Sequence, residues 1–359
     1  MKCKSPLPLG TRHSKNRYSK NGLREWINRF APVILKRTYS KRGVGVISTF
    51  ERPTIRPKGR ARWLIHLFPI PALIVYGLFV VYPIISAFLY SLYDWDGIKR
   101  GVFVGLKNFV TLFTVEPFNE MFWNAFGHNV YYFIVEMIVQ NGIAFGLAFL
   151  IYRKIRGSSF LKIAYFMPRL LSVIVIGFLW KLILNPNYGA LNTLLTKIGL
   201  EEWAKPWLGD PDTALLAIIL INCWFGIGFA MLIFLAGLQS IPEELIEAAR
   251  LDGARGFSLL WKIILPLCMP SITIMTIFTF IQAFEAFELV YAMQGSMGEP
   301  FRSTDTLAVY FYRLAFSSAG GAGDVSVGLG SALAVVLFFI VASVSALSLY
   351  LMRKREVQH

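Results

Sequence analysis

Six long apolar stretches divide the 359-residue chain, and they constrain its fold more than any other feature. A helix needs about 20 mostly apolar residues to cross the hydrocarbon core of a bilayer, where it satisfies its own backbone hydrogen bonds. The stretches therefore predict an all-α integral membrane protein with about six transmembrane helices. They run over Leu64–Tyr90, Asn129–Ile151, Leu161–Leu184, Ala214–Leu238, Ile263–Ala292 and Gly328–Met352.

The composition supports the membrane class, because 55% of the residues are hydrophobic and only 16% are charged. The net charge of +15 comes from one end, since residues 1–62 hold 17 Lys and Arg against 2 Asp and Glu. A basic terminal segment beside an apolar stretch favours membrane lipid, and not nucleic acid, as its partner. We expect a basic cytoplasmic N-terminal extension over residues 1–62 and a six-span domain over residues 63–359. Residues 23–35 within the extension fit either an interfacial helix or a solvated tail.

Lys and Arg in the short loops predict the orientation in the membrane, because such loops stay preferentially in the cytoplasm. This rule places both termini in the cytoplasm, together with the loop 239–262. The loops 91–128, 185–213 and 293–327 then lie outside. The marker residues, apart from the basic extension, are Arg153, Lys154, Arg156, Arg353, Lys354 and Arg355.

The sequence contains no constellation typical of an enzyme. It has no Gly-rich phosphate loop ending in Gly-Lys-Ser or Gly-Lys-Thr, so ATP hydrolysis is not expected in this chain. The four histidines and three cysteines are scattered, and the run Gly320–Gly323 indicates a flexible loop. We therefore expect no catalytic residues, no metal site and no cofactor bound by the chain itself.

The loop between the fourth and fifth stretches has the pattern of two short helices joined by a glycine turn. Ser240 is expected to cap a first helix that begins with Pro242 and two acidic residues and ends near Leu251. Gly253 is expected to take the left-handed conformation that ends a helix. A second amphipathic helix then leads into the fifth stretch at Pro266.

Within this loop, Glu247-Ala248-Ala249 is followed directly by Asp252-Gly253-Ala254, with Ile241-Pro242 before and Leu265-Pro266 after. The string resembles the EAA loop of the permease subunits of bacterial ABC importers. That resemblance implies a cytoplasmic coupling helix that docks on a separate ATPase subunit and transmits its motion. An ordinary helical connector remains the alternative on physical grounds alone. The residues implied in ATPase coupling are Glu247, Ala248, Ala249, Asp252 and Gly253.

Further blocks extend the resemblance over Leu64–Arg355 to the MalF-type carbohydrate permeases, among them Val81-Tyr82-Pro83, Asn185-Pro186 and Trp207-Leu208-Gly209-Asp210-Pro211. This resemblance implies import of a sugar or oligosaccharide across the bacterial cytoplasmic (inner) membrane by alternating access. It also implies a second homologous permease subunit, two ATPase subunits that bind ATP and Mg, and an external solute-binding protein. The long N-terminal segment and the weak Gly-rich stretch Gln294–Pro300 depart from the family pattern.

Polar residues within the fourth and fifth stretches mark the interior of the helix bundle, because they are costly in lipid. Their role is either to line a substrate path or to form hydrogen bonds between helices. The resemblance favours the path. The residues assigned to it are Asn222, Phe225, Gly226, Phe229, Thr279 and Gln282.

Two other transport functions remain open at this stage. An ABC permease for a sugar phosphate, as opposed to a sugar or a polyol, would be favoured by an excess of basic residues along the path. The candidates are only Lys162, Arg169 and Lys181, and their positions in the sequence put all three near the membrane faces. An ion-coupled secondary transporter would instead use acidic residues within the spans. The candidates for that role are Glu136, Glu285 and Glu288.

Overall fold

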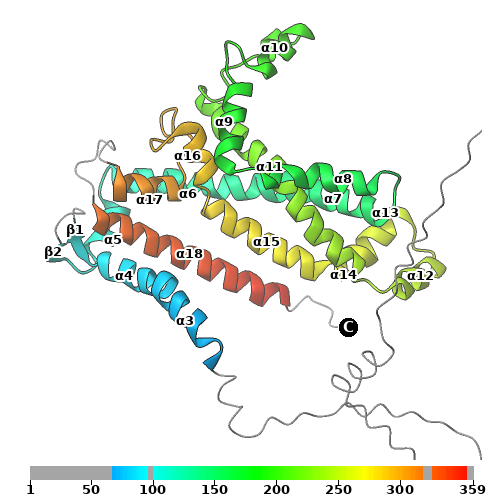
Figure 1. Ribbon diagram of the computed structural model, residues 1–359, viewed down its shortest axis with the longest axis horizontal. Helices are drawn as coiled ribbons and strands as arrows, with labels where there is room; N and C mark the ends of the chain where they lie inside the picture. The colour runs from blue at the N-terminus through cyan, green and yellow to red at the C-terminus, as the bar shows by residue number, and fades with distance from the viewer. Residues whose placement is uncertain (1–66, 96–99, 318–325, 354–359) are drawn as a thin grey trace, which may run out of the picture. The chain divides into compact units, whose positions relative to one another are not determined.

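The computed structural model describes residues 67–95, 100–317 and 326–353, which are mostly helical (Figure 1). The chain divides into two units at His66, and all described residues belong to the second unit. The basic extension predicted over residues 1–62 and the flexible loop predicted at Gly320–Gly323 lie outside the described residues.

The described helices follow the chain in an order that alternates long apolar segments with short connecting helices. Three segments are π-helical, at Gly77–Val81, Glu136–Gln140 and Leu260–Ile264, and two are 3-10 turns, at Met167–Leu170 and Glu201–Trp203. The α-helices are α3 (Ile70–Tyr76), α4 (Tyr82–Tyr90), α5 (Lys107–Thr114), α6 (Phe118–Val135), α7 (Asn141–Tyr152), α8 (Ser158–Phe166), α9 (Val173–Ile183), α10 (Ala190–Lys197), α11 (Pro211–Gln239), α12 (Glu243–Leu251), α13 (Gly256–Leu259), α14 (Leu265–Leu267), α15 (Met269–Phe284), α16 (Glu288–Gln294), α17 (Leu307–Phe316) and α18 (Val327–Arg353).

Five helical segments of the described chain are long and apolar enough to cross a membrane, and a bent pair makes up to six. The prediction of an all-α protein with about six spans is therefore confirmed. The five segments are Ile70–Tyr90, Phe118–Tyr152, Pro211–Gln239, Met269–Gln294 and Val327–Leu351.

The third predicted span is broken, so the expectation of one unbroken helix over Leu161–Leu184 is wrong. The segment Ser158–Leu170 meets α9 at an angle of 98°. Pro168 lies in the 3-10 turn before the break, where its ring removes a backbone donor, and Leu171 has extended backbone with φ −85° and ψ 153°. Hydropathy reports the length and composition of a segment and does not reveal such a break.

Two other predicted boundaries also differ from the structure. The second span begins at Phe118 and not at Asn129, because the polar residues of its first turns lower the hydropathy without interrupting the helix. The fifth span begins at Met269 and not at Ile263, because the chain breaks at Cys268 after the short apolar helix Gly256–Leu267.

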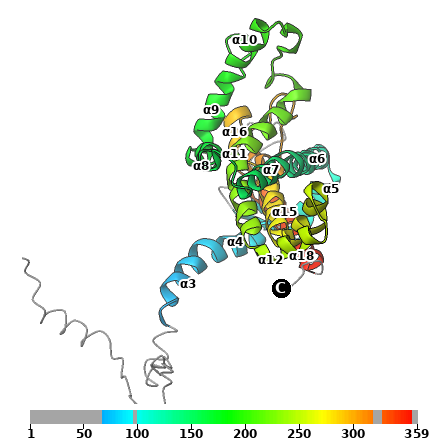
Figure 2. The same ribbon diagram turned by 90° about the vertical axis from the view of Figure 1, so that its right-hand side faces the viewer.

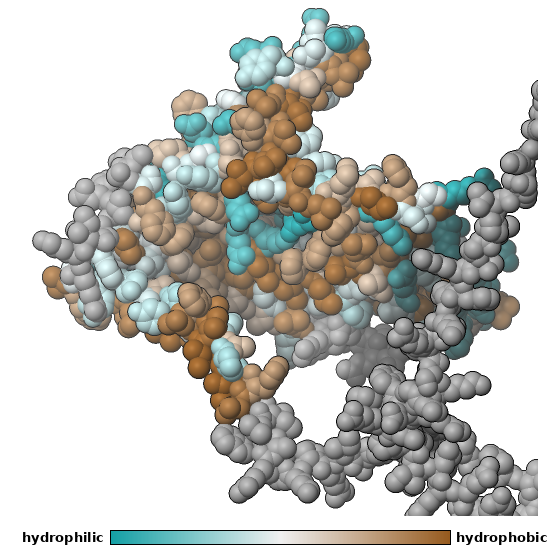
Figure 3. Space-filling model, in the orientation of Figure 1, coloured by the Kyte–Doolittle hydropathy of each residue, from teal (hydrophilic) through white to brown (hydrophobic). Residues whose placement is uncertain are grey.

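Helix α11 forms the centre of the bundle and packs along α7. Of its most apolar 18-residue stretch, 67% is buried within the chain. The corresponding buried share is 6% for the first span and 17% for the last. Figure 1 shows α15 and α18 on one side of α11, while α9 and α10 extend away from the bundle in both views (Figure 2). The hydrophobic surface of α3, α4 and α9 in Figure 3 is what lipid or another membrane subunit would cover.

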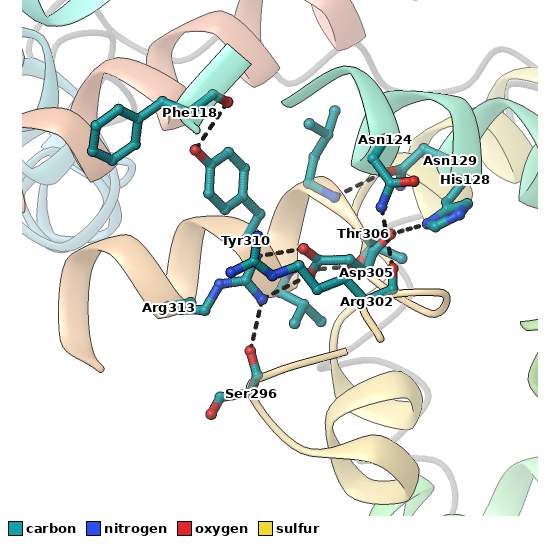
Figure 4. A network of polar contacts seen from close by, with 12 residues as sticks. Phe118, Asn124, His128, Asn129, Ser296, Arg302, Asp305, Thr306, Tyr310 and Arg313 are labelled. Carbon is teal, nitrogen blue, oxygen red and sulfur yellow. Dashed lines mark hydrogen bonds and ion pairs between the residues drawn. The ribbon is translucent and has the colours of Figure 1, made fainter. Parts of the chain in front are cut away.

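A buried ion pair connects the loop after α16 to α17 (Figure 4). The guanidinium of Arg313 pairs with the carboxylate of Asp305 through both nitrogens, and it donates a further hydrogen bond to the backbone carbonyl of Ser296 at 3.0 Å. The Tyr310 hydroxyl on the same helix donates to the carbonyl of Phe118 at 3.2 Å. These contacts tie α17 to the loop after α16 and to the start of α6.

Asn129 on α6 connects three elements of the same region (Figure 4). Its amide donates to the carbonyl of Ala283 on α15 at 2.6 Å and accepts from the amide of Leu307 on α17 at 2.8 Å. His128 Nδ1 lies 2.7 Å from the backbone carbonyl oxygen of Asp305. A short antiparallel pair, β1 (Tyr93–Trp95) and β2 (Arg100–Phe103), follows the first span and lies at the same end of the bundle in Figure 1.

Candidate functional site

A cavity of about 400 Å³ lies between α11, the bent pair and the junction of α15 and α16. In Figure 3, hydrophilic residues gather below α9 in a largely hydrophobic surface. Polar side chains are costly within a membrane bundle unless they face a cavity or a partner, so this concentration indicates a binding path. The lining residues are Tyr132, Gln140, Arg169, Val173, Asn222, Phe225, Gly226, Gln282, Glu285, Ala286, Phe287, Glu288, Leu289 and Val290.

One wall of the cavity is held by a buried pair of polar side chains. The Asn222 Nδ2 group on α11 donates a hydrogen bond of 2.6 Å to Glu136 Oε1, and the Glu136 side chain is fully buried. Glu136 begins the π-helical segment Glu136–Gln140, a type of helix distortion often found at functional sites. The pair fixes the orientation of the Asn222 amide at the cavity wall.

Gly226 allows a second amide to reach the cavity. A Cβ atom at Gly226 would lie 2.7 Å from Cδ of Gln140, well inside van der Waals contact. Because the glycine leaves this space, the Gln140 side chain crosses the surface of α11, and both residues line the cavity. The amides of Gln140 and Asn222 thus both contribute polar groups to the cavity lining.

Arg169 lies at the break of the bent pair and covers the aromatic side chains of α11. Its guanidinium carbon is 4.7 Å from the ring centroid of Phe225 and 6.0 Å from that of Phe229, a cation–π arrangement. The carboxylates of Glu288 and Glu136 act electrostatically on the same guanidinium. The sequence treated Arg169 as a residue near a membrane face, and the structure places it in the cavity wall.

The opposite wall carries acidic and amide groups. Glu285 and Glu288 are exposed at the junction of α15 and α16, and Gln282 lies one turn earlier, half-buried. Carboxylates, amides and a guanidinium around an aromatic face are the groups that orient a ligand rich in hydroxyls. The cavity is thus suited to a polar, uncharged or weakly charged ligand.

The structure brings together four of the six residues assigned to the substrate path, namely Asn222, Phe225, Gly226 and Gln282. Phe229 packs beside Phe278 at 5.4 Å between centroids and does not line the cavity. Thr279 is fully buried, and its hydroxyl accepts a hydrogen bond of 2.9 Å from Asn141 between α15 and α7.

Sequence reasoning missed Tyr132 and Gln140 as cavity residues. Gln140 could have been found from the sequence. Its amide, like that of Asn222, is energetically costly within an apolar span unless it faces a cavity or a polar partner. Tyr132 carried none, since a tyrosine fits an apolar helix whether it lines a cavity or packs in the core.

The loop after α11 folds as two short helices, as expected, and Gly253 has a φ of +88°. The prediction that Ser240 caps α12 is wrong. Ser240 ends α11 and its hydroxyl donates to the carbonyl of Gly237 at 2.8 Å, while Pro242 precedes the first turn of α12 without a side-chain cap. The acidic residues in that first turn supply the favourable charge instead.

Helix α12 has one buried and one exposed face. Ile246 and Ala249 pack into the core formed with α7, α11 and α15. Glu247, Ala248 and Leu251 are exposed, with Leu251 at 89% of its full accessibility. A single exposed apolar residue such as Leu251 is ordinary on a protein surface and does not by itself mark a contact.

The part of the chain described here contains no group of three or more His, Cys, Asp or Glu side chains that could hold a metal ion. Its two cysteines, Cys223 and Cys268, are buried and unpaired.

The family comparison decides the class of the protein. Residues 140–358 match the model of the binding-protein-dependent transport system inner membrane component family, and this range contains α7 to α18 with the cavity and the α12 loop. The chain belongs to this family. It is a multi-pass membrane permease subunit of an ABC transporter, in which ATP is hydrolysed by a separate subunit.

Curated relatives align with most of this chain. The probable starch degradation products transport system permease protein AmyD of Thermoanaerobacterium thermosulfurigenes is 31% identical, in an alignment that covers 81% of this chain and 94% of AmyD. The trehalose/maltose transport system permease protein MalF of Thermococcus litoralis is 30% identical, and the alignment covers 84% of this chain and 98% of that protein. The sn-glycerol-3-phosphate transport system permease protein UgpA of Agrobacterium fabrum is 31% identical, and the alignment covers 81% of this chain and 94% of UgpA.

A solved structure shares the fold of the permease. A chain of a bacterial ABC transporter involved in the import of the acidic polysaccharide alginate aligns with a TM-score of 0.69 at 22% identity. The alignment covers 82% of this permease and 96% of the other chain. The resemblance to permease subunits of ABC importers, first found in short motifs, is confirmed by these comparisons.

Proposed function

We propose that this permease is one membrane subunit of an ATP-binding-cassette importer that carries a sugar or oligosaccharide across the cytoplasmic membrane by alternating access. The observation that carries the proposal is the cavity around Asn222, Phe225 and Gln282, which combines amides, charged groups and an aromatic face inside a membrane bundle. Hydroxyl groups of a saccharide match those donors and acceptors, and a sugar face can stack on an aromatic ring.

The proposed assembly contains a second homologous permease subunit, two ATPase subunits that bind ATP and Mg, and an external solute-binding protein. Family membership and the exposed face of α12 support the ATPase contact. The orientation predicted from Lys and Arg in the short loops would put α12 and both termini in the cytoplasm, where ATP is available, and the network around Asp305 outside. The contact would then be formed by the exposed residues Glu247, Ala248, Asp252 and Gly253. Ala249 is buried and packs α12 onto the core.

Alternating access follows if the ATPases bind the two permease conformations unequally. ATP binding draws the ATPases together, and α12 on each membrane subunit moves with its docking site. A ligand shifts a conformational equilibrium only by its difference in affinity for the two states. The permease therefore needs a rigid link from α12 to the cavity, and the shared core of α12, α7 and α11 supplies it.

A polyol or a sugar phosphate is the second candidate cargo. Arg169 in the cavity wall favours an anionic group, as does the relative that transports sn-glycerol-3-phosphate. Glu285 and Glu288 line the same cavity and oppose an anion by like-charge repulsion. Competition by neutral and phosphorylated sugars in an uptake assay separates the two candidates, and stronger inhibition by the phosphate ester would favour the second.

Replacement of Gln282 by Ala is expected to lower saccharide uptake about fivefold to tenfold, the loss expected from one hydrogen bond to the ligand. Gln282 is half-buried on the cavity wall, so the fold and the assembly of the complex are expected to persist. Uptake by the reconstituted complex measures the effect. Thr276→Ala on the same helix, away from the cavity, is the matched control, and equal losses in both variants would contradict the assignment.

A cysteine at Ala248 is expected to crosslink to the ATPase subunit, whereas one at Ala249 is not, because only Ala248 is exposed.

Gly253→Pro is expected to abolish ATP-driven uptake while the subunit remains in the membrane. Proline cannot reach a φ of +88° and lacks the amide hydrogen that Gly253 donates to Arg250 at 3.1 Å. Crosslinking from Ala249 but not Ala248, or normal uptake with Gly253→Pro, would contradict the proposed docking face.

A further inference from the structure

A second cavity, of about 580 Å³, lies between the end of α7, helix α12 and the segment from α13 to Ile264. Three arginines from separate elements surround it, Arg153 after α7, Arg250 on α12 and Arg255 before α13. The cavity therefore combines a basic rim with an apolar interior. The apolar wall includes Phe149, Leu260 and Ile264.

The three arginines form no close ion pair within the part of the chain that the structure describes. Each side chain is exposed, none forms an ion pair or a side-chain hydrogen bond with another described residue, and no acidic residue lines the cavity. Guanidinium groups present forked donors that match phosphate oxygens, and three of them around one cavity attract an anion.

This cavity adjoins the exposed docking face of α12, since Arg250 follows Glu247 by one turn. Ile246 and Arg250 lie one turn apart on the side of the helix that faces the cavity, whereas Ala248 and Leu251 are exposed away from the core. The position of the cavity at the cytoplasmic boundary of the membrane rests on the proposed function.

We propose that this cavity binds an anionic phospholipid, with the phosphate between the three arginines and an acyl chain against Phe149, Leu260 and Ile264. The apolar wall favours a lipid over a free phosphate, which would leave that wall without a partner. A volume of 580 Å³ lies within the range of about 300–1,000 Å³ for small-molecule sites. Anionic lipids are abundant in the leaflet that faces the cytoplasm, and basic pockets between membrane helices bind their headgroups.

The test compares two variants that each lose two positive charges from the same end of the bundle. Arg153→Gln with Arg255→Gln removes two arginines of the cavity, and Lys154→Gln with Arg156→Gln removes two exposed charges of the neighbouring loop that do not line it. The full complex is reconstituted in nanodiscs of phosphatidylcholine with or without phosphatidylglycerol. Native mass spectrometry then measures the phosphatidylglycerol retained by the released complex, with and without added inorganic phosphate.

We expect the Arg153/Arg255 variant to retain phosphatidylglycerol about 30-fold more weakly, equivalent to about 1 kcal/mol for each arginine. The Lys154/Arg156 variant should lose little, and inorganic phosphate should not displace the lipid. Equal losses in both variants, or displacement by inorganic phosphate, would overturn the lipid site. A loss of ATP-driven uptake that is the same in both lipid mixtures would assign the arginines to the ATPase contact and overturn it as well.

Uptake by the unsubstituted complex is measured in the same two lipid mixtures. Normal ATP-driven uptake without retention of phosphatidylglycerol would contradict the lipid site and leave the proposed function intact. Absence of ATP-driven uptake from a complex that retains the lipid would contradict the proposed function alone.

Discussion

Replacement of Arg313 by Met is expected to destabilise the folded permease by about 3–5 kcal/mol, because it leaves the Asp305 carboxylate buried without a partner. Both side chains are almost completely buried, and the pair connects α17 to the loop after α16. Thermal unfolding of the purified permease measures the loss. The double variant Asp305→Asn/Arg313→Met removes both charges and is expected to recover part of the lost stability.

The loss caused by Arg313→Met should also depend on pH. Burial raises the pKa of the Asp305 carboxyl above its ordinary value, and Arg313 opposes that shift. Without Arg313 the folded-state pKa rises further, so the penalty is present above that pKa and decreases as the pH falls towards about 4, the ordinary value for Asp. A loss that does not vary with pH, or a double variant less stable than Arg313→Met, would contradict the role of this pair.

Replacement of Gly228 by Leu is expected to destabilise the bundle by about 3 kcal/mol or more, because α11 lies against the backbone of α8 at this residue. A Cβ atom at Gly228 would lie 2.6 Å from the carbonyl carbon of Tyr165 and 2.7 Å from the Cα of Phe166. Backbone atoms cannot rotate aside, so the two helices must separate. Thermal unfolding of the purified permease measures the effect.

The matched control for Gly228→Leu is Gly146→Leu on α7, where a Cβ would meet no atom within 4 Å and the residue is exposed. A loss near zero is expected there. Because Gly228 lies one turn from the cavity residue Phe225, the substitution is also expected to reduce uptake by whatever complex still assembles. Equal stability of the two variants would contradict the close packing of α11 on α8.

The fold class followed from hydropathy because a membrane span is recognised from length and composition alone. The break at Leu171 did not follow, because hydropathy averages over Pro168 and does not report a change in the direction of the chain. The end of α11 at Ser240 was missed for a related reason. A serine can cap the next helix or bond back to the previous one, and only the three-dimensional path of the chain decides between them.

Part of the cavity was predictable because a polar residue inside a span costs free energy unless it faces a cavity or the interior of the bundle. That argument found Asn222 and Gln282, which line the cavity, but it also selected Thr279, which bonds to Asn141 inside the bundle. Polarity marks the interior of the bundle without separating a cavity wall from a contact between helices. The glycine turn at Gly253 was predictable because few other residues adopt a positive φ.

We expect this permease to couple saccharide import to ATP, and vesicle uptake tests that coupling most directly. The permease is reconstituted with its sister subunit and two ATPase subunits, with the solute-binding protein on one side of the membrane and ATP on the side of α12. Accumulation of labelled saccharide is measured with and without ATP, in the presence and absence of an ion gradient. We predict uptake that requires ATP and the binding protein and that persists without the gradient. Uptake driven by an ion gradient in the absence of ATP would contradict the account.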